Sequence, residues 1–458
     1  MEMIKLLDHA YTQIQWGDLP AYLRDIERVK TKIEKVPDND ALRAEYLLIT
    51  SIEYVRDVNR LCAVYQEAVR LLHGQKSRLA YIPYPFHDYF NVYALCNIKP
   101  GHAEENAEKV QEICTLYYKL TGVKSSAYVC YQAQLAFYRG DMTVARKLAA
   151  EAFTAALAAK EGMVALCAAD TLTGIARHLQ DRALWEHASG YINKMAAGIT
   201  EKERACAELA RQISSRQDLA IGFLHSVPEW VRNGDFGFIA TPWGFQNIEK
   251  KILGSTFENA LFTQIQYLTY SGDSIRSLQE ADAAQKVYGF NDVITDVYLD
   301  ILRVCSYLKM GLFELGQQAM IRVVEKIAPD GLWLIVAEYV QTFDRLLYET
   351  VRNYAPEGEQ YIRTLGTGYL KKLIPFQKEI LNDDVIGLTK REQEVASLLI
   401  CGMSNAEISE KLFISERTVK SHITNIFRKY NICRRGQLAE AMKESKEIRL
   451  ADWIQNIS

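Results

Sequence analysis

Six basic side chains gather in a short stretch near the carboxyl end of the chain, between residues 415 and 435. They are Arg417, Lys420, Arg428, Lys429, Arg434 and Arg435, and one acid, Glu416, lies among them. In a helix, Lys420, Ser421 and Thr424 would share one side. Cationic side chains neutralise phosphates, while amino and hydroxyl groups hydrogen-bond to base edges. The chemistry that this pattern favours is recognition of a nucleic acid.

The positive charge is local to this part of the chain. Residues 388–446 hold eleven Lys and Arg residues against seven Asp and Glu residues, a net charge of +4. The whole chain has 54 basic and 57 acidic residues, a net charge of −3, so the remaining residues carry −7. A positive patch on an otherwise acidic protein is what phosphate neutralisation requires.

Short amphipathic helices are predicted to position these side chains. Thr389 and Glu392 form a T-x-x-E capping box, which predicts a helix from Lys390. Gly402 follows the last apolar residue of this helix and suits a left-handed helix end. Its apolar stripe comprises Val395, Ala396, Leu398 and Leu399.

Two further caps follow in the same order along the chain. Ser404 with Glu407 predicts a second helix that ends at Leu412, and Ser415 is the predicted cap of a third helix that ends at Tyr430. The third helix is predicted to bury Val419, Ile423, Ile426 and Tyr430 and to expose Arg417, Lys420, Ser421, Thr424 and Arg428. A fourth helix is predicted at about 437–446. This order of capped amphipathic helices favours a helix-turn-helix that inserts its third helix into the DNA major groove. The alternative is a helical hairpin with a solvated charged face.

The segment resembles the LuxR-type helix-turn-helix of bacterial transcription factors. The residues that carry the resemblance are LTKREQEV from Leu388, Gly402, Asn405, Ile408, LFISERTVKSH from Leu412, and Lys429. The resemblance implies that Lys420, Ser421 and Thr424 contact bases. It also implies phosphate contacts from Asn405, Ser415, Arg417, Thr418 and Lys429. His422 has two open roles, support of helix packing and contact with phosphate. The fourth helix is the usual dimer contact of this family, so a homodimer on DNA is expected.

The pattern of the first 375 residues predicts an all-α repeat. Apolar residues recur at intervals of three and four, and a Gly-Asp turn recurs at 17–18, 140–141 and 272–273. Glycine suits a left-handed helix end and aspartate caps the next helix. Spacings near 40 residues fit a tetratricopeptide-like superhelix, and a compact helical bundle is the alternative. The clearest predicted helices are 125–138, 141–159, 162–178 and 181–195.

This region resembles the superhelical repeat domain of MalT-type regulators, in which repeats precede a LuxR-type domain. The resemblance rests on Ala136 to Asp141 (AFYRGD) and Ala328 to Leu332 (APDGL). MalT-type proteins usually begin with an ATPase module. No Gly-Lys pair occurs in this chain, so the phosphate-binding loop of such a module is absent. The strand–helix alternation of a receiver domain is missing as well.

Two stretches interrupt the repeats, and both are rich in aromatic residues and proline. They are residues 81–93 (YIPYPFHDYFNVY) and residues 227–245, the second with three glycines and two tryptophans. Aromatic side chains dominate small-molecule pockets, so either stretch is a candidate to line a ligand groove. The interpretation that both stretches pack loops against the repeats is favoured.

The organisation predicted from these patterns has four parts. They are a repeat domain (1–375), a linker (376–387), a LuxR-type four-helix domain (388–446) and a tail (447–458). Nine cysteines without a C-x-x-C pair fit reduced thiols rather than disulfides or a zinc site. No run of apolar residues reaches the ~20 that a membrane span needs. A soluble, cytoplasmic protein is therefore expected.

The sequence shows no constellation typical of an enzyme. It lacks G-x-S-x-G and H-E-x-x-H motifs, and its eight histidines are dispersed. No catalytic residue, metal ligand or cofactor is therefore predicted. The favoured hypothesis is a sequence-specific transcriptional regulator of double-stranded DNA whose repeats sense a small molecule or a protein. The alternative is an interaction scaffold that recruits a partner protein to DNA.

Overall fold

The computed structural model describes most of the chain. The described residues are 2–16, 19–35, 38–79, 91–197, 210–214, 216, 219, 228–234, 255–286, 292–367, 376, 390–412, 414–429 and 434–438. Every regular element among them is a helix, as the repeat pattern predicts, so the fold is all-α. No helix among these residues is both long enough and apolar enough to cross a membrane.

The helices of the first half begin with α1 (Glu2–Trp16), α2 (Leu19–Ile33), α3 (Asp40–Thr50), η1 (Ser51–Tyr54), α4 (Val58–Leu71) and α5 (Val92–Cys96). They continue with α6 (Ala103–Thr121), α7 (Ala127–Arg139), α8 (Met142–Ala159), α9 (Gly162–Leu179) and α10 (Arg182–Ala197). The four helices predicted between 125 and 195 are confirmed as α7 to α10, with ends within two residues of prediction.

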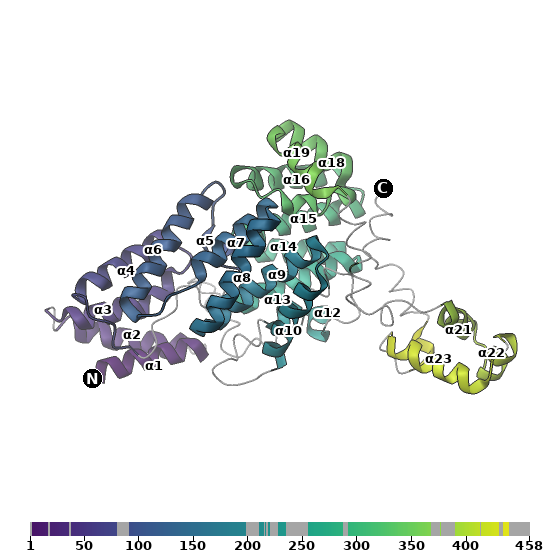
Figure 1. The fold of residues 1–458 in the computed structure, drawn as a ribbon, viewed down its shortest axis with the longest axis horizontal. Coiled ribbons are helices and arrows are strands. Elements are labelled where there is room, and N and C mark those ends of the chain that lie inside the picture. The colour runs from purple at the N-terminus through teal and green to yellow at the C-terminus, as the bar shows by residue number, and fades with distance from the viewer. Residues whose placement is uncertain are drawn as a thin grey trace. The chain divides into compact units, whose positions relative to one another are not determined.

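The helices of the second half are α12 (Glu229–Asn233), α13 (Ser255–Ser271), α14 (Ser274–Lys286), α15 (Val293–Lys309), α16 (Phe313–Ile327) and η4 (Ala328–Asp330). They are followed by α17 (Leu334–Ala337), α18 (Val340–Tyr354), η5 (Pro356–Gly358) and α19 (Glu359–Gly366). Consecutive helices pack as antiparallel pairs, most extensively α7 with α8, α8 with α9, and α15 with α16. Figure 1 shows these stacked pairs. The region is a helical-repeat fold.

The predicted turn chemistry is confirmed wherever the turn is described. Gly140 has φ +86°, and the Asp141 carboxylate accepts a hydrogen bond from the Val144 N–H at 3.0 Å. Gly272, with φ +94°, repeats this before Asp273, and the pair at 17–18 lies outside the described residues. Such caps are worth ~1 kcal/mol each. The spacing of hairpins is therefore set locally, turn by turn.

Small side chains bring α8 and α9 close together. Ala145, Ala149, Ala152 and Ala156 of α8 are fully buried, as are Ala165, Ala168 and Ala169 of α9. Without bulky side chains, helix axes approach more closely, which suits stacked hairpins. The buried alanines therefore allow α8 to pack closely against α9.

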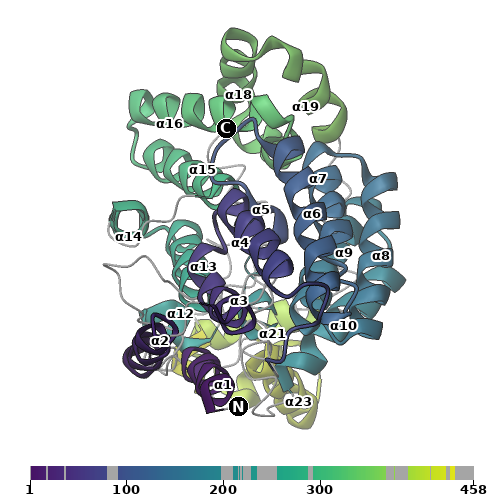
Figure 2. The same cartoon turned by 90° about the vertical axis from the view of Figure 1, so that its left-hand side faces the viewer.

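The repeats also make contacts between residues far apart in sequence. The buried Asp330 carboxylate accepts hydrogen bonds from the backbone N–H groups of Gly101 (2.7 Å) and Ala103 (3.0 Å), at the start of α6. Arg139 donates to the Asp330 carbonyl oxygen and forms an ion pair with Glu104 at 2.7 Å. In a simple solenoid each repeat contacts only its neighbours. Here η4 and α17 pack against the α6–α7 hairpin, which Figure 2 shows on the far side of the stack from α14.

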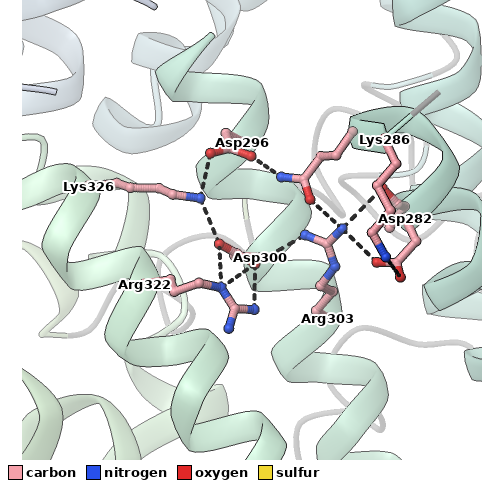
Figure 3. Close-up of polar contacts among 9 residues, drawn as sticks. Asp282, Lys286, Asp296, Asp300, Arg303, Arg322 and Lys326 are labelled. Carbon is pink, nitrogen blue, oxygen red and sulfur yellow. Dashed lines mark hydrogen bonds and ion pairs between the residues drawn. The ribbon is translucent and has the colours of Figure 1, made fainter. Parts of the chain in front are cut away.

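A buried ionic network joins α14, α15 and α16 (Figure 3). The Asp300 side chain is 1% exposed and accepts hydrogen bonds from Arg303 (3.1 Å), Arg322 (2.9 Å) and Lys326 (2.8 Å). Arg303, 6% exposed, also donates to the Ala281 carbonyl oxygen at 3.1 Å. Burial alone would raise the pKa of Asp300, but Arg322 and Lys326 outweigh it and lower that pKa. The buried charges of Asp300 and Arg303 are thus compensated by each other and by more exposed partners on the neighbouring helices.

Residues 217–227 and 368–458 form a second compact unit, separate from residues 1–216 and 228–367. Its described helices are α21 (Lys390–Ile400), α22 (Asn405–Leu412), α23 (Glu416–Lys429) and η6 (Arg435–Gln437). The first three match the helices predicted from the capping boxes. Of the predicted fourth helix, only 437–438 are described, and 439–446 lie outside the described residues.

Candidate DNA-binding site

An apolar core fixes the three helices of the second unit against one another. It is formed by seven side chains, each at most 3% exposed: Val395, Ala396, Leu399, Ile408, Val419, Ile426 and Leu438. Ile423 packs against this core, so three of the four residues predicted to face inward on α23 do so. The fourth, Tyr430, lies outside the described residues. Burial of one side of α23 leaves its other side for contact with a ligand.

The turn between α21 and α22 is fixed by local hydrogen bonds. Gly402 has φ +86°, and its N–H bonds the Leu399 carbonyl oxygen at 3.0 Å. The predicted capping box is present, because the Glu407 carboxylate accepts hydrogen bonds from the Ser404 N–H and hydroxyl, both at 2.7 Å. The bond from the Ser404 N–H lowers the pKa of Glu407. The start of α22 is therefore held at a defined angle to α21.

The start of α23 is capped by Ser415, as predicted. The Ser415 hydroxyl oxygen accepts a hydrogen bond from the Thr418 N–H at 3.1 Å, and the two hydroxyl groups lie 2.8 Å apart. Both side chains are exposed. Asn405, the first residue of α22, is half-buried. These three predicted phosphate contacts lie at or near helix N-termini, where the helix dipole favours anions.

The outer face of α23 carries the predicted base contacts. Lys420, Ser421 and Thr424 are exposed, and so is Arg417, whereas Val419 on the other side is fully buried. His422 is half-buried beside this face. Lys429 is the last residue of α23, and its side chain, like that of Arg428, lies outside the described residues. The structure thus gathers four of the predicted contacts on one exposed helical surface, which the major groove can accept.

Two arginines of this unit have roles that the charge pattern did not reveal. Arg435 donates to the carbonyl oxygens of Leu399 (3.2 Å) and Met403, where α21 ends. Arg391 donates to the Leu412 carbonyl oxygen at the end of α22. Arg435 belongs to the basic cluster near the carboxyl end of the chain, but its guanidinium caps a helix terminus. Carbonyl groups left without partners at a helix end attract such cations, which was the available signal.

Comparison with known proteins places this unit in a family. Residues 387–442 match the model of bacterial regulatory proteins, luxR family. The spore germination protein GerE of Bacillus subtilis is 41% identical over 63 residues, which cover 14% of this chain and 85% of GerE. The chain belongs to the LuxR family of bacterial regulatory proteins. The LuxR-type helix-turn-helix predicted from the sequence is therefore confirmed.

Other relatives of this LuxR-family chain cover less of their own length. The transcriptional regulatory protein DegU of Brevibacillus brevis is 30% identical over 168 residues, which cover 35% of this chain and 65% of DegU. The transcriptional regulatory protein LiaR of B. subtilis is 52% identical over 52 residues, 11% of this chain and 25% of LiaR. The chain thus spans between a quarter and two thirds of these two relatives. No solved structure matches it.

Proposed function

We propose that this chain is a bacterial transcriptional regulator that binds double-stranded DNA in a sequence-specific manner. The observation that supports the proposal is that α23 is amphipathic. Val419 and Ile426 are fully buried in the core, while Lys420, Ser421 and Thr424 are exposed together. Relatives such as DegU and LiaR are transcriptional regulatory proteins. A rigid helix that presents one cation and two hydroxyl groups is suited to contact base edges.

The proposed contacts divide into two classes. Lys420 donates to the acceptors of guanine, and Ser421 and Thr424 contact neighbouring bases. The phosphate contacts are Asn405, Ser415, Arg417, Thr418 and Lys429, which set the position of α23 along the groove. Because phosphates carry no sequence information, only the first class determines the preferred operator. Two chains bind as a homodimer on two half-sites.

The remaining parts have the following proposed roles. Residues 1–375 form a MalT-like repeat domain that lacks an ATPase module and senses a ligand or a protein partner. Residues 376–387 link it to the DNA-binding domain (388–446), and a tail (447–458) follows. The signal shifts the population between arrangements that bind DNA and those that do not. The protein acts in the cytoplasm without a cofactor or catalytic activity of its own.

One observation favours the alternative, a scaffold that recruits a protein to DNA. The α15–α16 turn exposes Leu312 (40%), Phe313 (69%) and Leu315 (42%), and Leu312 stands where other hairpins have a capping aspartate. Exposed apolar clusters often contact proteins. A pull-down with the full chain that recovers one stoichiometric protein, lost in Phe313→Ser, would support this function.

Genome-wide mapping of the DNA bound by the chain in its host tests the proposed regulator. The expected result is a set of sites that share a sequence motif, found mainly upstream of genes, and their loss in Lys420→Ala. Occupancy spread evenly over the genome, or unaltered by Lys420→Ala, would contradict sequence-specific regulation. The identity of the bound genes would also indicate the signal that the repeats sense.

A further inference from the structure

Polar side chains far apart in sequence converge within the repeat region at the end of α9. Asp170, Arg177 and His178 follow the spacing i, i+7 and i+8, which places them on one face of that helix. Gly174 lies between them and leaves room for the ring of Phe137 from α7, which makes an edge contact with His178 at 5.9 Å. This face of α9 is thus polar at both ends and aromatic in its middle.

Most charges of this cluster are paired by residues from other elements. Arg216 donates to the Asp170 carboxylate. His178 Nε2 and Glu338 Oε1 lie 2.8 Å apart, although the two residues are 160 positions apart in sequence. The partners come from the segment at 216 and from the residue that follows α17. The cluster therefore exists only when the repeats are stacked and closed.

Arg177 differs from its neighbours because it has no such partner among the residues that the structure describes. Among the described residues, it makes no hydrogen bond or ion pair, and its Nε is buried without a partner. Gln212, 1% exposed and four positions before Arg216, also has both amide atoms without a partner. Buried polar groups are nearly always satisfied, and leaving one unpaired is costly. An unpaired cation beside paired charges is the arrangement of a site that is completed by an anion.

A tyrosine side chain lies near the same cluster. Tyr298 of α15 lies within electrostatic range of Arg177, Arg216 and Glu338, and burial raises the pKa of its phenol well above the usual range. The paired side chains nevertheless keep accessible surface, 20% for Asp170, 18% for Arg216 and 23% for Glu338. Partly accessible polar groups from three separate parts of the chain therefore converge here. Aromatic walls with a few convergent polar groups are typical of small-molecule sites.

We infer that this cluster binds a small carboxylate with a flat apolar body, and that Arg177 pairs with its carboxylate group. A guanidinium group matches a carboxylate with two parallel hydrogen bonds. The rings of Phe137 and Tyr298 contact the apolar body, and the buried amide of Gln212 offers a further hydrogen bond. Asp170 and Glu338 are already paired, so they do not repel the anion as free carboxylates would. The inference rests on the proposed sensing role of the repeats and gives that role a site and a ligand class.

The test uses the purified full chain and three probes, benzoate, phenylacetate and indole-3-acetate, each at millimolar concentration. At least one should raise the melting temperature by ~2–4 °C, as expected for a ligand well above its Kd. The uncharged analogues benzamide and benzyl alcohol should give no shift. Failure of all three carboxylates to shift the melting temperature would overturn the inference.

Two variants separate a binding role of Arg177 from a structural one. Arg177→Gln should abolish the shift with carboxylate and leave the melting temperature of the free protein unchanged or higher, because no hydrogen bond or ion pair to a described residue is lost. Arg70→Gln, which removes an exposed guanidinium (63%) of α4, should keep the shift. An equal shift in Arg177→Gln, or a clear loss of its stability without ligand, would assign Arg177 to packing. DNA binding is measured separately. A chain that binds the carboxylate through Arg177 but does not bind DNA would contradict only the proposed regulatory function.

Discussion

The Thr424 hydroxyl group donates a hydrogen bond to the backbone carbonyl oxygen of Lys420, 2.9 Å away within α23. The only proton of that hydroxyl is therefore used inside the helix. What the exposed Thr424 side chain can still offer a ligand is its methyl group and its oxygen lone pairs. Methyl groups of threonine contact the C5-methyl group of thymine in the major groove. Two of the three proposed base contacts, Lys420 and Thr424, thus differ in kind.

Thr424 is expected to select thymine through its methyl group. Thr424→Val keeps a methyl at this position and should retain affinity for the preferred duplex, whereas Thr424→Ser should lose up to ~1 kcal/mol, about the transfer free energy of one buried methylene. Anisotropy titrations with duplexes that carry thymine or uracil at each position measure this. Replacing the contacted thymine by uracil should weaken the wild type and leave Thr424→Ser unaffected. A Thr424→Val variant that loses all preference would show that the hydroxyl does the selecting.

Lys420 is expected to supply the main polar contact to a base. Lys420→Ala should weaken binding to the preferred duplex by ~1–3 kcal/mol and relax specificity at one position. Lys411→Ala removes an equally exposed ammonium group from α22, outside the proposed contacts, and serves as the matched control. Circular dichroism should show the same melting curve for both variants. Equal losses of DNA affinity in the two variants would show that Lys420 contributes only a general positive charge and no specific base contact.

Arg435 is expected to stabilise the second unit. Its guanidinium donates to two carbonyl groups at the end of α21, and hydrogen bonds from charged donors are worth ~1.5–3 kcal/mol. Arg435→Gln should therefore lower the denaturation midpoint of this unit, measured by urea unfolding. The neighbouring Arg434→Gln removes the same charge from an exposed side chain and should leave the midpoint within experimental error. A larger fall of the midpoint in Arg434→Gln than in Arg435→Gln would contradict these two roles.

Stability is expected to fall in acid because of Asp300. Its lowered pKa means that the folded state binds a proton less readily than the unfolded state, for which 3.8 is the ordinary value. The contribution of Asp300 is therefore complete above pH 3.8 and is lost as the pH falls through the lowered pKa. Urea unfolding between pH 7 and pH 3 should show this loss.

Asp300→Asn tests the origin of that acid dependence. It should flatten the dependence and lower stability by ~3–5 kcal/mol at pH 7, because the buried Arg303 loses its buried carboxylate partner and keeps only the exposed carboxylate of Asp282. Asp141→Asn, an exposed cap for which asparagine is an equally good residue, should change neither quantity. An unaltered pH profile in Asp300→Asn would place the acid sensitivity elsewhere.

Local features of this fold were predictable from the sequence. Ser404 with Glu407 and Gly140 with Asp141 specify helix ends through residues within four positions of one another, so the pattern alone locates them. The buried side of α23 follows from helical periodicity in the same way. The domain boundary at 375 and the eight proposed DNA contacts stay predictions.

Contacts between distant residues were not predictable. Asp330 caps the start of α6, which lies more than 220 positions earlier in the sequence. Glu338 contacts the ring of His178, which lies 160 positions earlier. No single helix requires these pairs, because they depend on how the whole stack closes. For the same reason, Arg435 looked like part of a basic patch until its distance to α21 was known. Arg177 likewise stands out only once its neighbours are seen to be paired.

In vitro selection from a pool of random duplexes shows whether α23 recognises a specific DNA sequence. The full chain is mixed with the pool, bound duplexes are recovered and sequenced, and the cycle is repeated at rising salt concentration. One motif should be enriched by the wild-type chain. Lys420→Ala should enrich a degenerate form of that motif, while Lys411→Ala should enrich the same motif as the wild type. A pool that stays random after selection with the wild-type chain would contradict the account.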